Sequence, residues 1–403
     1  MTLSRADPSV RLSGTGVGVP GTAGHASAVS LHRYLVSRAR FGVRLGLERI
    51  EALLARLGHP QRQFASVHVV GTNSKSTVTR MVEELLRARG LSVGAYLSPH
   101  VTRWEERIRI GGAEADLASM IDRLAPHVRQ LDEETGDPVT QFELLTAAAF
   151  CAFAEAGVDA AVIEAGLGGR YDATNTINAP VVVLTGVGLD HQEHLGETRE
   201  EIAAEKLAVV GRGSTVVVGE REWAGAAQAA CQGRVLNASG SVQLAAAAAS
   251  AFLGERVDPT PATSVVLPGR LEHVGDSPVE VWDGAHNAEG ARWLVVQLGG
   301  APHVLVASIL RDKPVEEMLQ VLSQLATTLV ATASTNERAL TAEALAARAA
   351  RLSVFADIRI EPNPVAARSL GRSLAHRSGK RLLVAGSLYL LGDLTPVRQR
   401  PVP

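Results

Sequence analysis

A lysine and two hydroxyl residues stand together in the segment Val67–Thr77, VHVVGTNSKST, where their types and spacing suit phosphate chemistry. An apolar run ends in a tight turn that carries Lys75, Ser76 and Thr77, and a helical pattern (Val78–Arg89) follows at once. In such a turn, backbone N–H groups and the positive end of the helix dipole face an anion, and a lysine reaches the terminal phosphates. The hydroxyl beside the lysine can hold Mg²⁺. The segment therefore predicts a triphosphate site.

The match to the general phosphate-loop pattern, G-x-x-x-x-G-K-[ST], is incomplete. Val69 and Ser74 occupy the positions of the two glycines. On this pattern alone, a phosphate loop and an ordinary strand–turn–helix without a ligand remain equally open. Residues elsewhere in the chain have to decide between them.

Polar residues also follow three other predicted strands. Ser98 comes after the strand that ends at Tyr96, Glu164 ends a buried strand, and His191 follows a third. A single such residue is more often structural than functional, but three at the edge that carries the phosphate turn favour a ligand site, because open α/β sheets bind ligands at that edge. Oxygen ligands with one imidazole suit Mg²⁺ or Mn²⁺, which binds together with substrate phosphates.

Strand and helix patterns alternate along the chain, which predicts a parallel sheet with helices on both faces. Two of the strand runs are apolar throughout and are expected to be buried on both sides. The first series consists of Leu45–Leu57 (helix), Val67–Val70 (strand), Ser92–Tyr96 (strand), Met120–Glu134 (helix), Phe142–Ala156 (helix), Ala160–Glu164 (strand), Val181–Thr185 (strand), Thr198–Val209 (helix), Ser214–Val218 (strand) and Gln243–Leu253 (helix).

The alternation restarts after the proline-containing stretch Pro259–Pro268, so we expect a second domain from residue 265. Its elements are Val279–Trp282 (strand), Ala288–Leu298 (helix), His303–Ser308 (strand), Pro314–Leu325 (helix), Thr328–Ala331 (strand), Thr341–Arg351 (helix) and Arg381–Ala385 (strand).

Length and composition agree with a globular chain of two domains. The 403 residues exceed what one core usually serves, and 46% are hydrophobic against 20% charged. A net charge of −2 implies no nucleic-acid partner, and no apolar run is long enough to span a membrane. Cys151 and Cys231 are expected to be buried thiols. Residues 1–28 are rich in Ser, Gly, Thr and Pro and are expected to be a disordered tail.

Ten segments in order resemble the folylpolyglutamate synthase/dihydrofolate synthase family, within the ATP-dependent Mur ligases. The likeness runs from about residue 30 to residue 394. It is carried by FGVRLGLERIEALLARLGHPQRQF, VHVVGTNSKST, YLSPHVTRWEERIRI, QFELLTAAAF, IEAGLGGRYDATN, GLDHQEHLG, EEIAAEKLAVV, LPGRLE, DGAHNAEGAR and AGSLYLLGDL.

The resemblance implies an α/β protein with an N-terminal, mostly parallel-sheet, P-loop-like ATP-binding domain (29–264). A smaller, Rossmann-like C-terminal glutamate-ligase domain (265–403) follows. The family activates the carboxylate of a pteroate or folate as an acyl phosphate, and the amino group of L-glutamate then displaces phosphate. The expected partners are these small molecules with ATP and Mg²⁺, in a cytoplasmic monomer without nucleic-acid or membrane partners.

The resemblance also assigns roles to individual residues. Lys75, His191 and Lys206 are the expected catalytic residues, and Lys206 matches a lysine that CO₂ carbamylates in the family. The expected nucleotide contacts are Asn73, Ser74, Lys75, Ser76, Thr77, Arg270, Asp283 and His286. The expected metal ligands are Ser76, Ser98, Glu164, His191 and Lys206. The expected pterin contacts are Thr140, Gln141, Phe142, Glu143, Tyr171, Asp172 and Ala173.

Two departures from the family pattern leave alternatives open. The family reads G-T-N-G-K-G-S where this chain has Ser74 and Ser76, and Ser74 costs about 1 kcal/mol if its conformation is left-handed. Ala246 stands where the family has a nucleotide-contacting asparagine. The alternatives are a Mur-type ligase acting on another carboxylate and a nucleotide-binding relative with little ligase activity.

Overall fold

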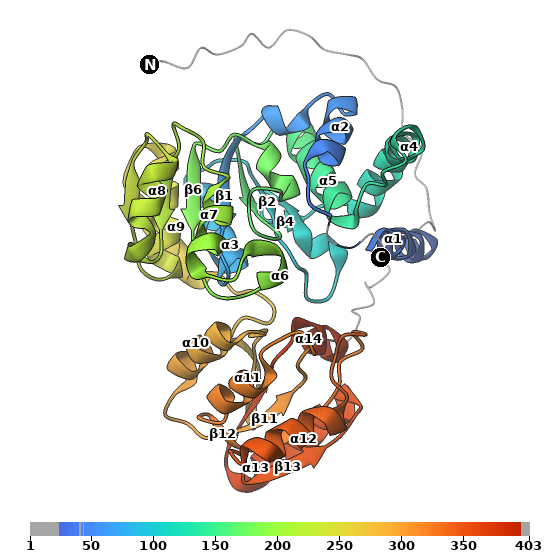
Figure 1. Ribbon diagram of the computed structural model, residues 1–403, viewed down its shortest axis with the longest axis vertical. Coiled ribbons are helices and arrows are strands. Elements are labelled where there is room, and N and C mark those ends of the chain that lie inside the picture. Colours follow the sequence, from blue (N-terminus) through green and yellow to red (C-terminus); the bar gives the residue numbers. More distant parts are fainter. Residues whose placement is uncertain (1–23, 40–41, 43, 396–403) are drawn as a thin grey trace.

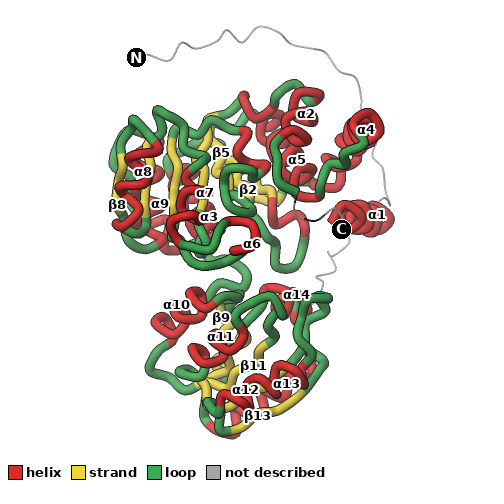
Figure 2. The backbone as a smooth tube through the Cα atoms, viewed as in Figure 1, coloured by secondary structure: helices red, strands yellow, loops and turns green. Residues whose placement is uncertain are grey.

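The computed structural model describes residues 24–39, 42 and 44–395, and in these ranges the chain forms two β-sheets flanked by helices (Figure 1). Residues 1–23, most of the expected tail, lie outside the described residues. The expected tail ends before residue 28, because helix α1 occupies Gly24–Ala39 and buries Leu31 and Leu35 in the core. In Figure 2 the strands of each sheet lie between helical layers, so the predicted α/β class is confirmed.

The first sheet has the strand order β4-β3-β2-β5-β1-β6-β7-β8. From β2 to β8 all neighbours are parallel, and β1 lies between β5 and β6. In that order the strands are Ala113–Glu114, Ile108–Ile110, Val93–Tyr96, Ala160–Glu164, Ala65–Val70, Val181–Leu184, Thr215–Val218 and Val235–Asn237.

Two apolar cores cover the faces of this sheet. Helices α3 (Lys75–Ala88) and α9 (Ser241–Leu253) form one core against the strands. The opposite core is built mainly by α2, α4, α5, α7 and α8, which are Glu48–Arg56, Leu117–Thr135, Gln141–Ala156, Arg199–Leu207 and Ala224–Ala230. The central strands carry apolar side chains on both faces because each face has its own helical layer.

The second sheet has the order β13-β12-β11-β14-β10-β9 and is parallel except for the β9–β10 hairpin. In that order the strands are Asp357–Ile360, Ala326–Ala331, His303–Ala307, Arg381–Ala385, Val279–Trp282 and Glu272–Asp276. Helices α10 (Ala288–Leu298), α11 (Val315–Leu322) and α12 (Ala342–Leu352) pack on one face. Helices α13 (Pro364–Ser378) and α14 (Leu388–Leu394) pack on the other.

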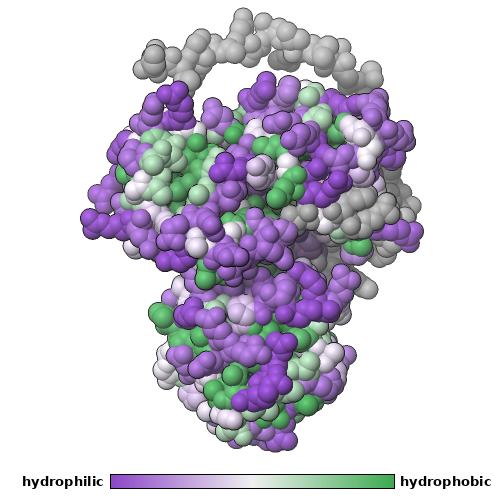
Figure 3. Space-filling model, in the orientation of Figure 1, coloured by the Kyte–Doolittle hydropathy of each residue, from purple (hydrophilic) through white to green (hydrophobic). Residues whose placement is uncertain are grey.

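Within its described part, the chain passes from one sheet to the other once, between the end of α9 at Leu253 and the start of β9 at Glu272. A short 3-10 turn, Thr260–Ser264, lies in this connection. On the face drawn in Figure 3, the surface where the two sheets meet is mostly hydrophilic. A domain boundary at residue 265 is therefore our proposal, placed inside this connection.

Two smaller expectations concern the cysteines and the membrane. Cys151 and Cys231 are both buried and free, which confirms the prediction of unpaired thiols. Among the helices of the described ranges, none combines the length and the apolar character that a membrane crossing requires.

Candidate active site

The turn after β1 has the geometry of an anion site. It joins Val70 to α3, and Ser74 adopts the left-handed conformation (φ 63°) directly before α3 begins at Lys75. The Ser74 side chain makes no capping hydrogen bond, so the first backbone N–H groups of α3 remain available to a ligand. Lys75 Nζ donates to the carbonyl oxygen of Thr72 at 3.2 Å, which holds the ammonium group beside the turn.

The strands on either side of β1 bring two more polar residues to this turn. Val69 pairs in register with Glu164 at the end of β5, and Val70 pairs with Leu184 at the end of β6. Thr185, directly after β6, donates from Oγ1 to the carbonyl oxygen of Asn73 at 2.7 Å. Because the parallel strands end at one edge, residues far apart in sequence gather there.

A cavity of about 650 Å³ opens at this edge and is closed on its other side by the second sheet. Every residue predicted to bind nucleotide or metal lines it. These residues are Asn73, Ser74, Lys75, Ser76, Thr77, Ser98, Glu164, His191, Lys206, Arg270, Asp283 and His286.

Glu164 is the buried carboxylate of this cavity. Its Oε1 accepts a hydrogen bond from Ser76 Oγ at 2.9 Å, and its Oε2 accepts one from the Ser98 backbone N–H at 3.1 Å. Burial raises the pKa of Glu164 to about 7, against the opposing charge of Lys75 and these hydrogen bonds. The buried Ser98 Oγ finds no hydrogen-bond partner among the described residues.

A carboxylate beside an unpaired buried hydroxyl is a suitable donor set for a hard divalent cation. In the described ranges, no group of three or more His, Cys, Asp and Glu residues could hold a metal ion by itself. Phosphate oxygens and water would therefore have to complete the coordination, which is how Mg²⁺ is usually bound. The residues present fit a cation that arrives with a phosphate ligand.

Lys206 of α7 lines the same cavity and reaches the phosphate turn. Its side chain is buried, and its Nζ donates to the carbonyl oxygen of Gly71 at 3.0 Å. Burial, together with the charge of Lys75, lowers the pKa of Lys206 to about 7. A neutral amine is therefore accessible near neutral pH. Glu205, the preceding residue, pairs instead with Arg170 at 2.8 Å.

The loop after β6 carries Asp190 and His191. His191 adopts the left-handed conformation (φ 52°), and its backbone N–H donates to Asp190 Oδ1 at 3.0 Å. Burial alone would raise the pKa of Asp190, but the charges of Lys313 and His191 outweigh it and hold that pKa well below its usual range. Burial lowers the pKa of His191.

The second sheet contributes the wall formed by the segment after β10. Asp283 accepts hydrogen bonds from the backbone N–H groups of Leu271 and Ala285 at 2.9 and 2.8 Å, and burial raises its pKa. His286 Nδ1 lies 2.8 Å from the carbonyl oxygen of Gly284, and burial lowers the pKa of His286 to about 4. Asp283 therefore orders the backbone of this wall.

Several polar contacts between the two sheets were not predicted from the sequence. Asn287 Nδ2 donates to Asn73 Oδ1 at 3.1 Å, and Asn73 Nδ2 donates to Glu289 at 2.8 Å. Lys313 Nζ donates to Asp190 Oδ1 at 2.7 Å. The sequence did offer one signal for Lys313: it follows closely after a strand of the second sheet. Glu164, which was predicted, ends a strand of the first sheet.

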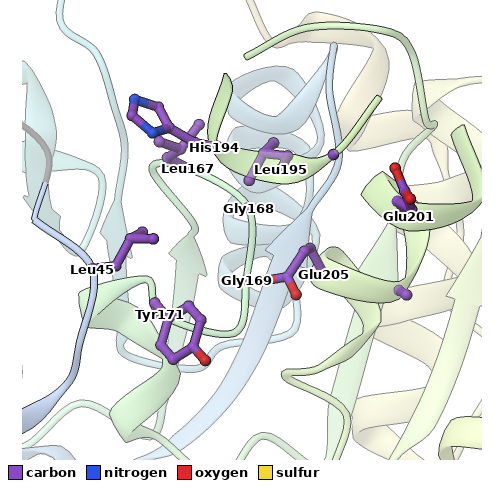
Figure 4. Close-up of a pocket in the computed structure, with 11 residues that line it drawn as sticks. Leu45, Leu167, Gly168, Gly169, Tyr171, His194, Leu195, Glu201 and Glu205 are labelled. Carbon is purple, nitrogen blue, oxygen red and sulfur yellow. The ribbon is translucent and has the colours of Figure 1, made fainter. Parts of the chain in front are cut away.

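A second cavity, of about 380 Å³, adjoins the first and shares Leu167, Gly168 and Leu195 with it. Figure 4 shows Leu45 and Tyr171 on one side of this cavity and Glu201 on the opposite side. Its lining is mainly apolar, with an aromatic ring at the wall. A flat, partly apolar molecule suits such a surface.

Of the residues predicted to contact the pterin, Tyr171 lines this second cavity and the other six line neither cavity. Thr140 and Glu143 cap α5, and Glu143 pairs with Arg49 at 3.0 Å. The Phe142 ring packs close to Gly166, where an added Cβ would lie 2.5 Å from it. Gln141 and Asp172 form hydrogen bonds with backbone groups, and Asp172 and Ala173 are buried.

Two α/β sheets that meet over a phosphate turn are the arrangement of the Mur ligases. The model of the Mur ligase middle domain matches residues 69–230, and that of the Mur ligase glutamate ligase domain matches residues 269–388. A dihydrofolate synthase/folylpolyglutamate synthase of Mycobacterium tuberculosis is 35% identical over 372 residues, which covers 74% of this chain and 76% of that protein. The chain belongs to the folylpolyglutamate synthase/dihydrofolate synthase family.

Solved structures of similar proteins agree. A folylpolyglutamate synthase of M. tuberculosis, complexed with ADP and AMPPCP, has a TM-score of 0.85 and 30% identity, covering 91% of this chain and 97% of that one. A bifunctional folylpolyglutamate synthase/dihydrofolate synthase with Mn, AMPPNP and L-glutamate bound has a TM-score of 0.78 and 26% identity, covering 90% and 97%.

Proposed function

We propose that the protein is an ATP-dependent ligase that joins L-glutamate to the carboxylate of a pteroate or folate. The observation that carries this proposal is that a phosphate turn, a buried carboxylate and residues of both sheets meet in one cavity, beside a second cavity lined by Tyr171. The relatives named for this activity, together with the neighbour that holds Mn, AMPPNP and L-glutamate, support it.

The proposed reaction has two steps. The acceptor carboxylate attacks the γ-phosphorus of ATP, so that ADP leaves and an acyl phosphate remains. The amine of glutamate then attacks the acyl carbon, phosphate leaves, and the nitrogen gives up a proton as the amide forms. Both steps place negative charge on phosphoryl oxygens, so correctly placed cations supply most of the rate enhancement.

The residues of this chain suit those tasks. The N–H groups at the start of α3 and the Lys75 ammonium face the phosphate position from the first sheet, and Arg270 faces it from the second. Ser76, Ser98, Glu164 and His191 would hold a divalent cation, which neutralises phosphate charge when bound. Closure of the two sheets over a bound substrate would exclude water and protect an acyl phosphate from hydrolysis.

Lys206 is proposed to act as a carbamate. Its amine is buried at the phosphate turn and is held by one backbone carbonyl group. Reaction of the neutral amine with CO₂ forms an N–C bond and releases a proton, and it replaces a cation by an anionic oxygen donor. Such a donor would complete the oxygen ligands near the turn. The unmodified amine paired with a phosphate is the competing role.

The acceptor is proposed to lie in the second cavity, with its ring system near Tyr171 and Leu45 and its carboxylate directed into the first. The shared residues Leu167, Gly168 and Leu195 mark the passage between the two cavities. The path from an aromatic wall to a phosphate turn matches an acceptor that is flat at one end and anionic at the other.

The direct test is incubation of the purified protein with ATP, Mg²⁺, labelled L-glutamate and either dihydropteroate or tetrahydrofolate. Labelled amide product with either acceptor supports the proposal, and the choice of acceptor defines the substrate. ATP binding without product from these acceptors contradicts it. That result would favour the nucleotide-binding relative that Ala246 suggests. Product with only an unrelated carboxylate would favour another Mur-type activity.

A further inference from the structure

Lys313 and Asp190 form an ion pair that is buried between the two sheets. Lys313 Nζ lies 2.7 Å from Asp190 Oδ1, and the two side chains are only 7% and 10% exposed. By comparison, the side chains of the ion pair Arg292–Glu317, which joins α10 to α11, are 58% and 49% exposed. A buried pair is retained at a desolvation cost, so its place in the molecule calls for an explanation.

Asp190 is held from three directions. Its Oδ1 accepts from Lys313 Nζ and from the backbone N–H of His191, and its Oδ2 accepts from Asn287 Nδ2 at 3.0 Å. The imidazole of His286 also faces it, with Nε2 at 4.0 Å from Oδ2. Two of the three hydrogen-bond donors come from the second sheet, while Asp190 belongs to the loop after β6.

His191, which lines the first cavity, directly follows Asp190 and hydrogen-bonds to it. His191 has a left-handed backbone, which is rare for a residue with a side chain. Its side chain makes no capping hydrogen bond to the short helix α6 (Gln192–Leu195) that follows. The hydrogen bond from the His191 N–H to Asp190 Oδ1 therefore helps to orient the imidazole that lines the first cavity.

We propose that Lys313 is a positioning residue for the ligation, which acts through Asp190 to set the loop that carries His191. In this way a residue of the second sheet's half positions His191 in the first cavity. The two halves of the molecule are correctly aligned only when the ion pair is formed. This inference rests on the proposed function for its kinetic consequence. The positioning of His191 itself is a statement about this chain alone.

Four variants test it: Lys313→Met, Lys313→Arg, Asp190→Asn and the double variant Lys313→Met/Asp190→Asn. Lys380→Met is the matched control, because Lys380 is also a lysine of the second sheet's half and its Nζ bonds only to the exposed Thr327 Oγ1 at 3.0 Å. Each protein is assayed for kcat and for KM of ATP, and its thermal unfolding midpoint is measured. Binding of MnCl₂ in the presence of AMPPNP is measured by calorimetry.

We expect Lys313→Met to lower kcat by about 10- to 100-fold, since a small misplacement of an aligned group has that effect. Binding of MnCl₂ with AMPPNP should weaken by about tenfold, the usual effect of losing a supporting contact. Lys313→Arg should recover most of both, and the double variant should be no worse than Lys313→Met, because the two residues act through one contact. Lys380→Met should match the parent protein.

Parent-like kcat and MnCl₂ binding in Lys313→Met would overturn the proposal. So would a loss in which Lys313→Arg is as poor as Lys313→Met, or in which the unfolding midpoint falls in proportion to activity, since both indicate a purely structural contact. If Lys313→Met does not fold, Asp190→Asn and Lys313→Arg decide by the same criteria. Absence of amide product from the parent protein would reject the proposed function instead, and the MnCl₂ binding would still test the positioning role.

Discussion

Ser76 Oγ donates a hydrogen bond to Glu164 Oε1 at 2.9 Å, and this contact joins the first turn of α3 to the carboxyl end of β5. The two residues are 88 positions apart, and they meet because β1 and β5 are neighbouring parallel strands. The pair is thus organised before any ligand arrives. A preorganised donor set loses little conformational freedom on binding, which favours tight placement of a cation and a phosphate.

Replacing Lys75 by alanine should abolish ATP-dependent ligation and leave the fold intact. Lys75 begins α3, and among the described residues the one hydrogen bond of its ammonium group is to the Thr72 carbonyl oxygen at 3.2 Å, so it supports little of the structure. Loss of a phosphate-directed cation in a closed site should lower the rate by about 10² to 10⁴-fold. Amide formation and the unfolding midpoint are measured, with Lys380→Ala as control. A Lys75→Ala protein that keeps more than half of the parent turnover would reject the phosphate-loop assignment.

Replacing Lys206 by alanine tests the carbamate. If the carbamate forms, Lys206→Ala should lose activity by at least about 10²-fold and regain part of it when acetate is added, because acetate supplies the missing carboxylate. Lys206→Ser, treated in the same way, is a second variant that lacks the amine. Inactivity without rescue would support the unmodified amine. Full activity would exclude any role for the Lys206 nitrogen.

Replacing Ser74 by glycine should stabilise the protein. Ser74 has a φ of 63°, which costs a residue with a side chain about 1–2 kcal/mol, whereas glycine pays about 0.5–1 kcal/mol in the unfolded state. The expected gain is about 0.5–1 kcal/mol, measured by denaturant unfolding. Ser353→Gly is the matched control, because Ser353 has a φ of 54° at the end of α12 and should show a similar gain. A loss of stability in Ser74→Gly would show that the serine hydroxyl contributes more than the strain costs.

Replacing Glu280 by glutamine should lower the free energy of unfolding at neutral pH. It should also make that free energy depend less on pH in the acidic range. Glu280 is buried in β10 and pairs with Arg368 at 2.7 Å and with Arg372. Burial alone would raise the pKa of Glu280, but hydrogen bonds from Arg368 and Trp282 outweigh it and lower that pKa. Since the folded-state pKa lies below the unfolded one, the pair stabilises fully above the unfolded pKa of about 4.3 and is lost as pH falls through the folded pKa.

We therefore expect Glu280→Gln to cost about 2–3 kcal/mol at pH 7, because the arginines are partly exposed and are solvated again. At pH 3 the difference from the parent should be smaller. Glu316→Gln is the control, since Glu316 is half exposed where it pairs with Arg348. An unchanged difference at both pH values would show that the Glu280 charge does not contribute.

The sequence predicts the buried central strands well and the sheet edges poorly. Ala160–Glu164 and Val279–Trp282 form strands with the expected bounds, because short, mostly apolar runs rich in β-branched residues are typical of buried strands. The short strands β3, β4 and β13 were not predicted. Ile108–Ile110 alternates with charged neighbours over only three residues, and an edge strand of that length is determined by its partner rather than by its own pattern.

In the candidate site, too, the sequence predicts some residues and misses others. Glu164 at the end of β5 and Lys75 at the start of α3 were predicted, because topology alone brings strand ends and the turns after them to one edge. The contact of Lys313 with Asp190 spans 123 positions and two sheets, and no local pattern encodes it. Glu143 is a different case: its place in a family motif suggested a ligand contact, which stays a prediction, and the structure pairs its carboxylate with Arg49.

The connection between Leu253 and Glu272, which is the one passage between the sheets in the described part of the chain, also tethers the two halves to each other. It holds each half near the other at an effective concentration on the order of millimolar, so their association needs little intrinsic affinity. This explains how a junction that is mostly hydrophilic on the face drawn in Figure 3 can suffice. Cutting the chain within this connection would turn a unimolecular closure into a bimolecular association. At low, equal concentrations of the two fragments, the activity would then rise with the square of the fragment concentration.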